Sequence, residues 1–86
     1  MRIKSGFNLI EKDGHYMISS EKAVKIKDTI YLDEISLFLW NELKQKEFSQ
    51  NEMLNLLLNK FEISTVLALS EIDKFVKILQ RNGIIE

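Results

Sequence analysis

The chain offers few side chains that could carry out chemistry. His15 is the only histidine, and it lies beside a predicted turn, where a lone histidine is more often a surface residue than a general base. Cysteine is absent, which excludes thiolate metal sites, cysteine nucleophiles and disulfides. The carboxylates are scattered along predicted helices without metal-ligand spacing, and no glycine-rich phosphate loop is present. We therefore expect no enzymatic activity, no metal site and no cofactor.

The predicted third helix carries more apolar side chains than one buried face requires. We expect Ser64 to cap it and the helix to run to about Asn82. When Ile72 is placed at the centre of the buried face, four apolar residues lie within about 60° of it: Leu69, Phe75, Val76 and Leu79. A stripe of this width accounts for one core face.

Leu67 and Ile78 lie outside this stripe, about 120–140° from its centre at 100° per residue. They share one edge of the helix with Glu71 and Lys74, at spacings of three and four residues. One interpretation is that both residues pack against the sheet or the first helix. The other is that they form the floor of an exposed groove, in which Phe75 joins groove and core and Lys74 selects among charged ligand positions.

The elements before this helix are predicted to be β-strands. Phe7–Lys12 and His15–Ser19 flank Asp13-Gly14, a dipeptide that favours a two-residue type I′ hairpin turn. Val24–Lys27 alternates with period two, as expected for a half-buried strand segment. Ile30–Leu32 is rich in β-formers and predicts a third, short strand.

One edge of the third strand is expected to be unpaired if the sheet has only three strands. The backbone donors and acceptors of Thr29–Leu32 would then be open to an incoming extended peptide. The alternative is that Lys25 and Lys27 protect this edge, because lysines on edge strands discourage pairing.

Three helices are predicted after the strands. Asp33 is a good cap for a helix that continues to Leu43, and Ser49 and Glu52 fit the capping box of a second helix. Gly83 stands where a left-handed helix terminator is expected. The second and third helices are joined by roughly three residues, which is helix-turn-helix spacing. The sequence thus predicts an α+β fold, winged helix-turn-helix-like, with a three-stranded antiparallel sheet followed by three helices.

Length and charge restrict the function further. The 86 residues predict one domain over positions 1–86. The net charge of -1 gives no positive field that would attract nucleic acid or an anionic membrane. The first turn of the predicted third helix, Ser64–Leu69, has no Arg, Lys, Asn or Gln to pair with bases. No apolar stretch approaches the ~20 residues that span a bilayer, and no signal peptide is evident, so we expect a cytoplasmic protein.

Five segments together resemble the PqqD-like family, the precursor recognition elements of ribosomally synthesised peptide (RiPP) pathways. They are Gly6–Leu9, Asp13-Gly14, Ile30–Glu34, Ser49–Phe61 and Leu79–Ile85. The resemblance covers most of the chain and rests on the order and spacing of the elements. It implies that the leader segment of a precursor peptide adds a strand beside the third strand, in a groove walled by the third helix.

The resemblance also implies a free-standing domain that presents the precursor to a modifying enzyme or leader peptidase, as in lasso peptide or radical-SAM systems. The expected peptide-binding residues are Thr29, Ile30, Tyr31, Leu32, Leu67, Glu71, Lys74, Phe75 and Ile78. Two alternatives remain open at this point, a DNA-binding winged-helix regulator and a structural protein-docking domain.

Overall fold

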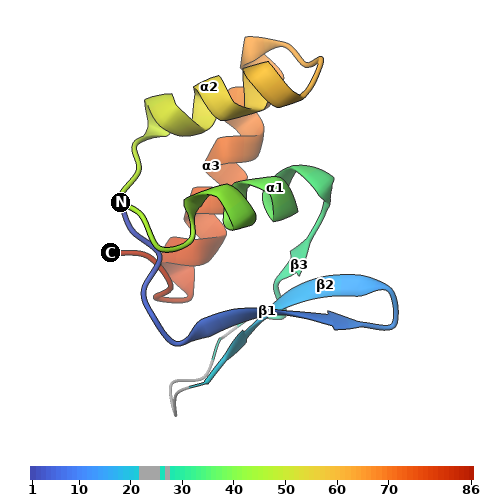
Figure 1. Ribbon diagram of the computed structural model, residues 1–86, viewed down its shortest axis with the longest axis vertical. Helices are drawn as coiled ribbons and strands as arrows, with labels where there is room; N and C mark the ends of the chain where they lie inside the picture. Colours follow the sequence, from blue (N-terminus) through green and yellow to red (C-terminus); the bar gives the residue numbers. More distant parts are fainter. Residues whose placement is uncertain (22–25, 27) are drawn as a thin grey trace.

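The computed structural model describes residues 1–21, 26 and 28–86. Its elements are β1 (Phe7–Lys12), β2 (His15–Ser20), β3 (Tyr31–Leu32), α1 (Glu34–Leu43), α2 (Gln50–Lys60) and α3 (Thr65–Arg81). Three strands precede three helices, so the predicted α+β order is confirmed (Figure 1). The strand predicted over Val24–Lys27 and the edge protection by Lys25 and Lys27 fall outside the described residues, apart from Ile26, which packs against the core.

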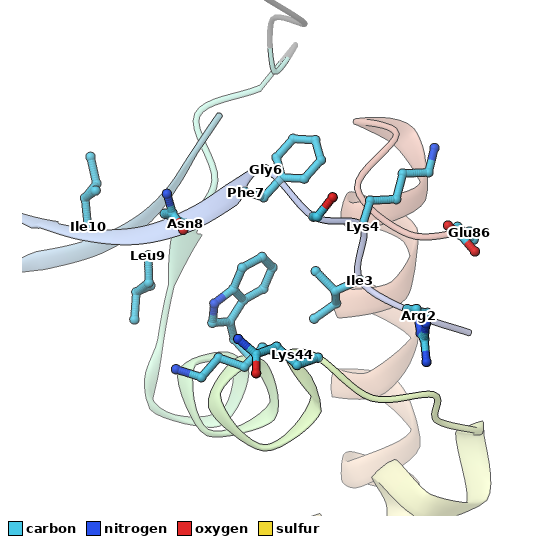
Figure 2. A pocket seen from close by; sticks show the side chains of 13 residues that line it. Arg2, Ile3, Lys4, Gly6, Phe7, Asn8, Leu9, Ile10, Lys44 and Glu86 are labelled. Carbon is cyan, nitrogen blue, oxygen red and sulfur yellow. The ribbon is translucent and has the colours of Figure 1, made fainter. Parts of the chain in front are cut away.

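The sheet is antiparallel with the order β1-β2-β3. β1 and β2 form the predicted hairpin, and both turn residues, Asp13 (φ 53°) and Gly14 (φ 80°), have the positive φ that a type I′ turn requires. β3 pairs with β2, and the N–H of Ile18 donates to the carbonyl oxygen of Ile30 (3.2 Å), one residue before β3 begins. β1 and β3 are therefore the two edges of this sheet. The outer edge of β1 shares a groove with Lys44, at the end of α1 (Figure 2).

Each helix begins at the predicted cap. Asp33 and Ser36 form a reciprocal capping box at α1, in which each backbone N–H donates to the other residue's side chain at 2.9 Å. Ser49 Oγ accepts from the N–H of Glu52 (3.2 Å) at α2, and Ser64 Oγ accepts from the third N–H of α3 (3.1 Å). Gly83, with φ 68°, ends the third helix as expected.

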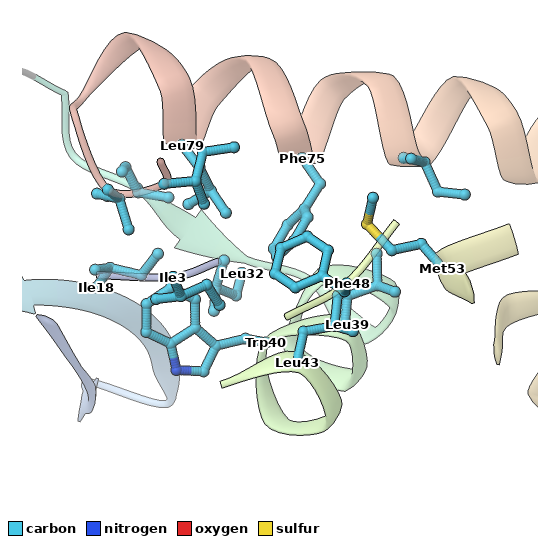
Figure 3. Close-up of a cluster of buried hydrophobic side chains, with 14 of the residues drawn as sticks. Ile3, Ile18, Leu32, Leu39, Trp40, Leu43, Phe48, Met53, Phe75 and Leu79 are labelled. Atoms are coloured by element: carbon cyan, nitrogen blue, oxygen red, sulfur yellow. The ribbon is translucent and has the colours of Figure 1, made fainter. Parts of the chain in front are cut away.

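The core lies between the sheet and the helices, and all three helices contribute to it (Figure 3). Its fully buried side chains are Leu39, Leu43, Met53, Leu57, Ile72, Leu79 and Ile84. The C-terminal segment folds back onto the core, where Ile84 and Ile85 are buried, and Ile85 bridges to Ile3. This packing holds α3 at a fixed position beside β3.

The prediction that Leu69 belongs to the core stripe is wrong, because its side chain is 37% exposed. Four residues of α3 form the stripe instead: Ala68, Ile72, Phe75 and Leu79. At 100° per residue, their mean direction lies about 30° from Ile72. Leu69 and Ile78 are then each about 90° from the centre, and only Ile78 has β3 beside it.

Candidate functional site

A groove of about 670 Å³ lies between the free edge of β3 and the side of α3. Its lining has an apolar part supplied by both walls and by the start of α1: Ile30, Leu32, Ile35, Phe75 and Ile78. Ile30, Leu32 and Phe75 are at most 8% exposed, because these side chains also belong to the core. The groove therefore has a rigid apolar floor set by the packing of the domain.

The free edge of β3 presents backbone groups to this groove. In an antiparallel strand, the N–H and C=O of one residue point to one side and those of the next residue to the other. The carbonyl of Ile30 accepts from β2, so the backbone groups of Thr29 and Tyr31 point away from β2. In the part of the chain that the structure describes, no strand pairs with this edge.

The structure brings eight of the nine predicted peptide-binding residues together at the groove. They are Thr29, Ile30, Tyr31, Leu32, Glu71, Lys74, Phe75 and Ile78. Leu67 does not line it; this residue lies in the first turn of α3 with a side chain that is 45% exposed. Leu67 thus fits neither of the two interpretations given for it, because it lies outside the core and outside the groove between β3 and α3. Sequence reasoning missed Ile35 and Ser36, which α1 contributes.

The rim of the groove along α3 is charged but internally balanced. Lys74 pairs with Glu71 (3.5 Å), Lys77 with Asp73 (3.0 Å) and Arg81 with Asp28 (2.9 Å). All three cationic side chains are more than two-thirds exposed, so each pair contributes little to stability and is screened by salt. The groove consequently offers its strongest binding energy to apolar side chains.

Asp28 and Asn82 join the start of the β3 segment to the end of α3. The N–H of Asp28 donates to Asn82 Oδ1 (2.9 Å), and Asn82 Nδ2 donates to Asp28 Oδ2 (3.0 Å) and to the carbonyl oxygen of Ile78 (2.9 Å). Asn82 is 5% exposed, and among the described residues it is the one polar side chain that is buried. These bonds fix the separation of the two groove walls at the Thr29 end. The sequence did not indicate these bonds, because an asparagine directly before Gly83 predicts only the end of a helix.

Comparison with known proteins identifies the family. A family model described as coenzyme PQQ synthesis protein D (PqqD) matches residues 14–85. The chain belongs to the PqqD family. PqqD-family proteins are non-catalytic peptide-binding chaperones, in agreement with the expectation that this chain is not an enzyme. No curated protein sequence matches the chain.

The fold of this PqqD-family chain is shared with a solved structure, that of TbiB1 in complex with the TbiA(beta) leader peptide. The TM-score is 0.74, and the match covers 100% of this chain and 95% of the other. Sequence identity over the match is 13%, so the comparison bears on the fold alone.

Other kinds of site find little support in this PqqD-family domain. Among the described residues, no three His, Cys, Asp or Glu side chains are grouped so that they could hold a metal ion. His15 is exposed, and its ring lies edge-on to that of Tyr31, with 5.8 Å between the ring centroids. No helix in the described part of the chain is long and apolar enough to cross a membrane.

The first turn of α3 does not resemble a DNA-reading surface. A recognition helix presents polar side chains to base edges from its N-terminal turns. Here the exposed residues of that turn include Val66 (79% exposed) and Leu67. These side chains offer no hydrogen bond to a base, which argues against the DNA-binding alternative.

Proposed function

We propose that this PqqD-family domain binds the leader segment of a ribosomally synthesised precursor peptide as an added strand on β3. The observation that supports this proposal most strongly is the apolar groove along the free edge of β3, with α3 as its other wall. The shared fold of TbiB1, solved with a leader peptide, supports the proposal. Residues 1–86 would act as one domain. The groove residues already named would form its binding site, and Leu67 would extend this site toward the start of α3.

In this proposal the backbone and the side chains have different tasks. The N–H and C=O groups of Thr29 and Tyr31 form ladder bonds to the peptide without selecting its sequence. Alternate peptide side chains enter the apolar floor beside Phe75 and Ile78, which selects for apolar residues at every second position. Micromolar affinity requires about 8 kcal/mol. Three filled apolar positions at about 1.5–3 kcal/mol each, together with the ladder bonds, supply an interaction energy of this order, against which the ordering costs count.

The direct experiment is titration with a synthetic candidate leader peptide. Backbone amide shifts should concentrate on Thr29–Leu32 and α3, and calorimetry should give a saturable isotherm. Shifts confined to α2 or to the Asp13-Gly14 turn would contradict the proposal.

A matched pair of variants at Tyr31 tests strand addition itself. Tyr31→Pro removes the outward N–H, which β2 does not use, and proline is tolerated where an edge-strand N–H faces solvent. Tyr31→Ala removes the same ring but keeps the N–H. We expect the proline variant to bind the leader peptide at least about tenfold more weakly than the alanine variant, a difference of about 1.4 kcal/mol. Equal affinities would show that the peptide does not bond to this edge.

We further propose that the bound leader is presented to a separate leader peptidase or modifying enzyme of the same pathway, as in lasso peptide or radical-SAM systems. This would occur in the cytoplasm, where the precursor is made, and without nucleic acid or a membrane as partner. The test is the rate at which that enzyme processes the precursor with wild-type chain, with Tyr31→Pro and without the chain. Equal rates in all three reactions would reject the delivery role while leaving leader binding intact.

A further inference from the structure

The sheet has a second free edge, on β1, that the proposed function does not use. The N–H of Glu21 donates to the carbonyl oxygen of Gly6 (2.8 Å), so the backbone groups of even-numbered residues point toward β2. Those of Phe7, Leu9 and Glu11 therefore point outward. β1 has six residues, whereas β3 has two, so its free edge is the longer one.

This edge lacks the usual protection against pairing. The strand contains no proline, and its first four residues, Phe7 to Ile10, carry no charge. In the described part of the chain no other strand covers it. A groove of about 1000 Å³ is lined by the first four residues of β1, by the segment 2–6 that precedes the strand and by the end of α1 (Figure 2). The space beside β1 is therefore open to another strand.

We propose that a second copy of this chain occupies this edge, with the two β1 strands antiparallel and centred on Leu9. The outward-facing residues then pair with one another, Leu9 with the partner's Leu9 and Phe7 with the partner's Glu11, giving about six hydrogen bonds. Centring the pair on Asn8 would set Glu11 opposite the partner's Ser5, which lies in the turn before β1, and would lose the bonds of Glu11. Centring it on Ile10 would lose the bonds of Phe7.

The charges around the groove fit this register. In the part of the chain that the structure describes, Lys4 and Lys44 form no ion pair, although both line the groove. Leu9 and Lys44 lie on the same side of β1 (Figure 2). Residues directly opposite in an antiparallel pair share a face, so the partner's Glu11 extends toward Lys44. The two-fold symmetry repeats this contact.

The dimer leaves the peptide groove free. Joining two copies through β1 gives one continuous sheet with β3 at each outer edge, so neither copy covers the groove beside α3. Dimerisation and peptide binding therefore use different residues and can be tested separately.

Sedimentation equilibrium at low ionic strength tests the proposal on the full chain. The wild type should move with concentration from 10.1 kDa toward twice that mass. Glu11→Lys alone and Lys44→Glu alone should each raise the dimer dissociation constant about tenfold or more, because each sets like charges together. An equimolar mixture of the two variants should recover the dimer, because the mixed pair has opposite charges at both contacts. Lys60→Glu, on α2 and outside the groove, is the control for net charge and should dimerise like the wild type.

Two results would overturn the proposal. One is a wild-type chain that stays at 10.1 kDa up to millimolar concentration. The other is a dimer that survives in Glu11→Lys and is lost in Tyr31→Pro, because copies would then be pairing through β3. Circular dichroism of each variant confirms that a loss of dimer is not a loss of fold.

Discussion

Asn82 should be one of the most sensitive positions for stability outside the apolar core. Replacing it with alanine removes the acceptor of the Asp28 N–H and the donor to the Asp28 carboxylate. It also removes one of the donors to the carbonyl oxygen of Ile78, which still accepts from the backbone N–H of residue 82 (3.3 Å). The main cost is thus the loss of both bonds to Asp28. One of these losses leaves the backbone N–H of Asp28 without an acceptor.

The expected magnitude follows from these bonds. A neutral hydrogen bond contributes about 0.5–1.5 kcal/mol and a bond to a charged group about 1.5–3 kcal/mol. Because the Asp28 side chain is 30% exposed, the second value is taken at its lower end, and we expect Asn82→Ala to lower the free energy of unfolding by about 2–3 kcal/mol. A domain of this size has about 4–13 kcal/mol in total. The variant should therefore fold in the cold and melt roughly 10–20 °C lower.

Urea denaturation followed by circular dichroism measures this loss. Arg81→Ala is the matched control, because its pair with the same carboxylate is largely exposed and should contribute less than about 1 kcal/mol. A double-mutant cycle of Asn82→Ala with Asp28→Ala should give a coupling energy of about 1 kcal/mol or more. A change below about 0.5 kcal/mol for Asn82→Ala, or additive effects in the cycle, would refute the reasoning.

Three other outcomes are expected. Ile78→Ala should weaken leader binding about tenfold or more. Its loss of stability should be smaller than the ~2–5 kcal/mol expected for Ile72→Ala. Leu67→Ala, measured in parallel by calorimetry, shows whether the site extends to the start of α3. The hydrogen bond and negative charge of Glu11 raise the pKa of Tyr16. An absorbance titration should therefore show Tyr16 ionising at higher pH in the wild type than in Glu11→Gln. The stability that this contact adds is present below pH ~10 and is lost as Tyr16 ionises. Mobility-shift titration should show no sequence-selective nanomolar binding to duplex DNA at physiological salt.

The order of elements and the helix caps could be predicted because each depends on local chemistry. Asp33, Ser49 and Ser64 accept from N–H groups three residues away, and the Asp13-Gly14 turn needs only its own two φ angles. Such features need no knowledge of distant segments. The free edge of the third strand was predicted because a short last strand in a three-stranded sheet is paired on one side only. The placement of the third helix as the wall of a groove beside this edge came from the family resemblance.

The burial of Ile72, Phe75 and Leu79 was predicted correctly. The surroundings of residues at the margins of that stripe could not be predicted, because they depend on contacts between distant segments. Leu69 and Ile78 lie at similar angles from the buried face, and only the position of β3 makes one of them a wall of the groove. The pair between Asp28 and Asn82 spans 54 positions, and no local pattern connects them. Helical periodicity gives the direction of a side chain but does not show which element covers it.

The two edges of the sheet differ in what they can select. β3 is short and lies against α3, so a strand added there must also fit the apolar side chains of Phe75 and Ile78. β1 is longer, and a strand added there meets Lys4 and Lys44, so charge decides which strand fits.

β2 is hydrogen-bonded to both edges, and any effect of one site on the other must pass through it. By linkage, the factor by which saturating leader peptide changes the dimer dissociation constant must equal the factor by which dimerisation changes leader affinity. Because the two sites share no residue, we expect both factors to be close to one, and a large shared factor would identify β2 as a coupling element.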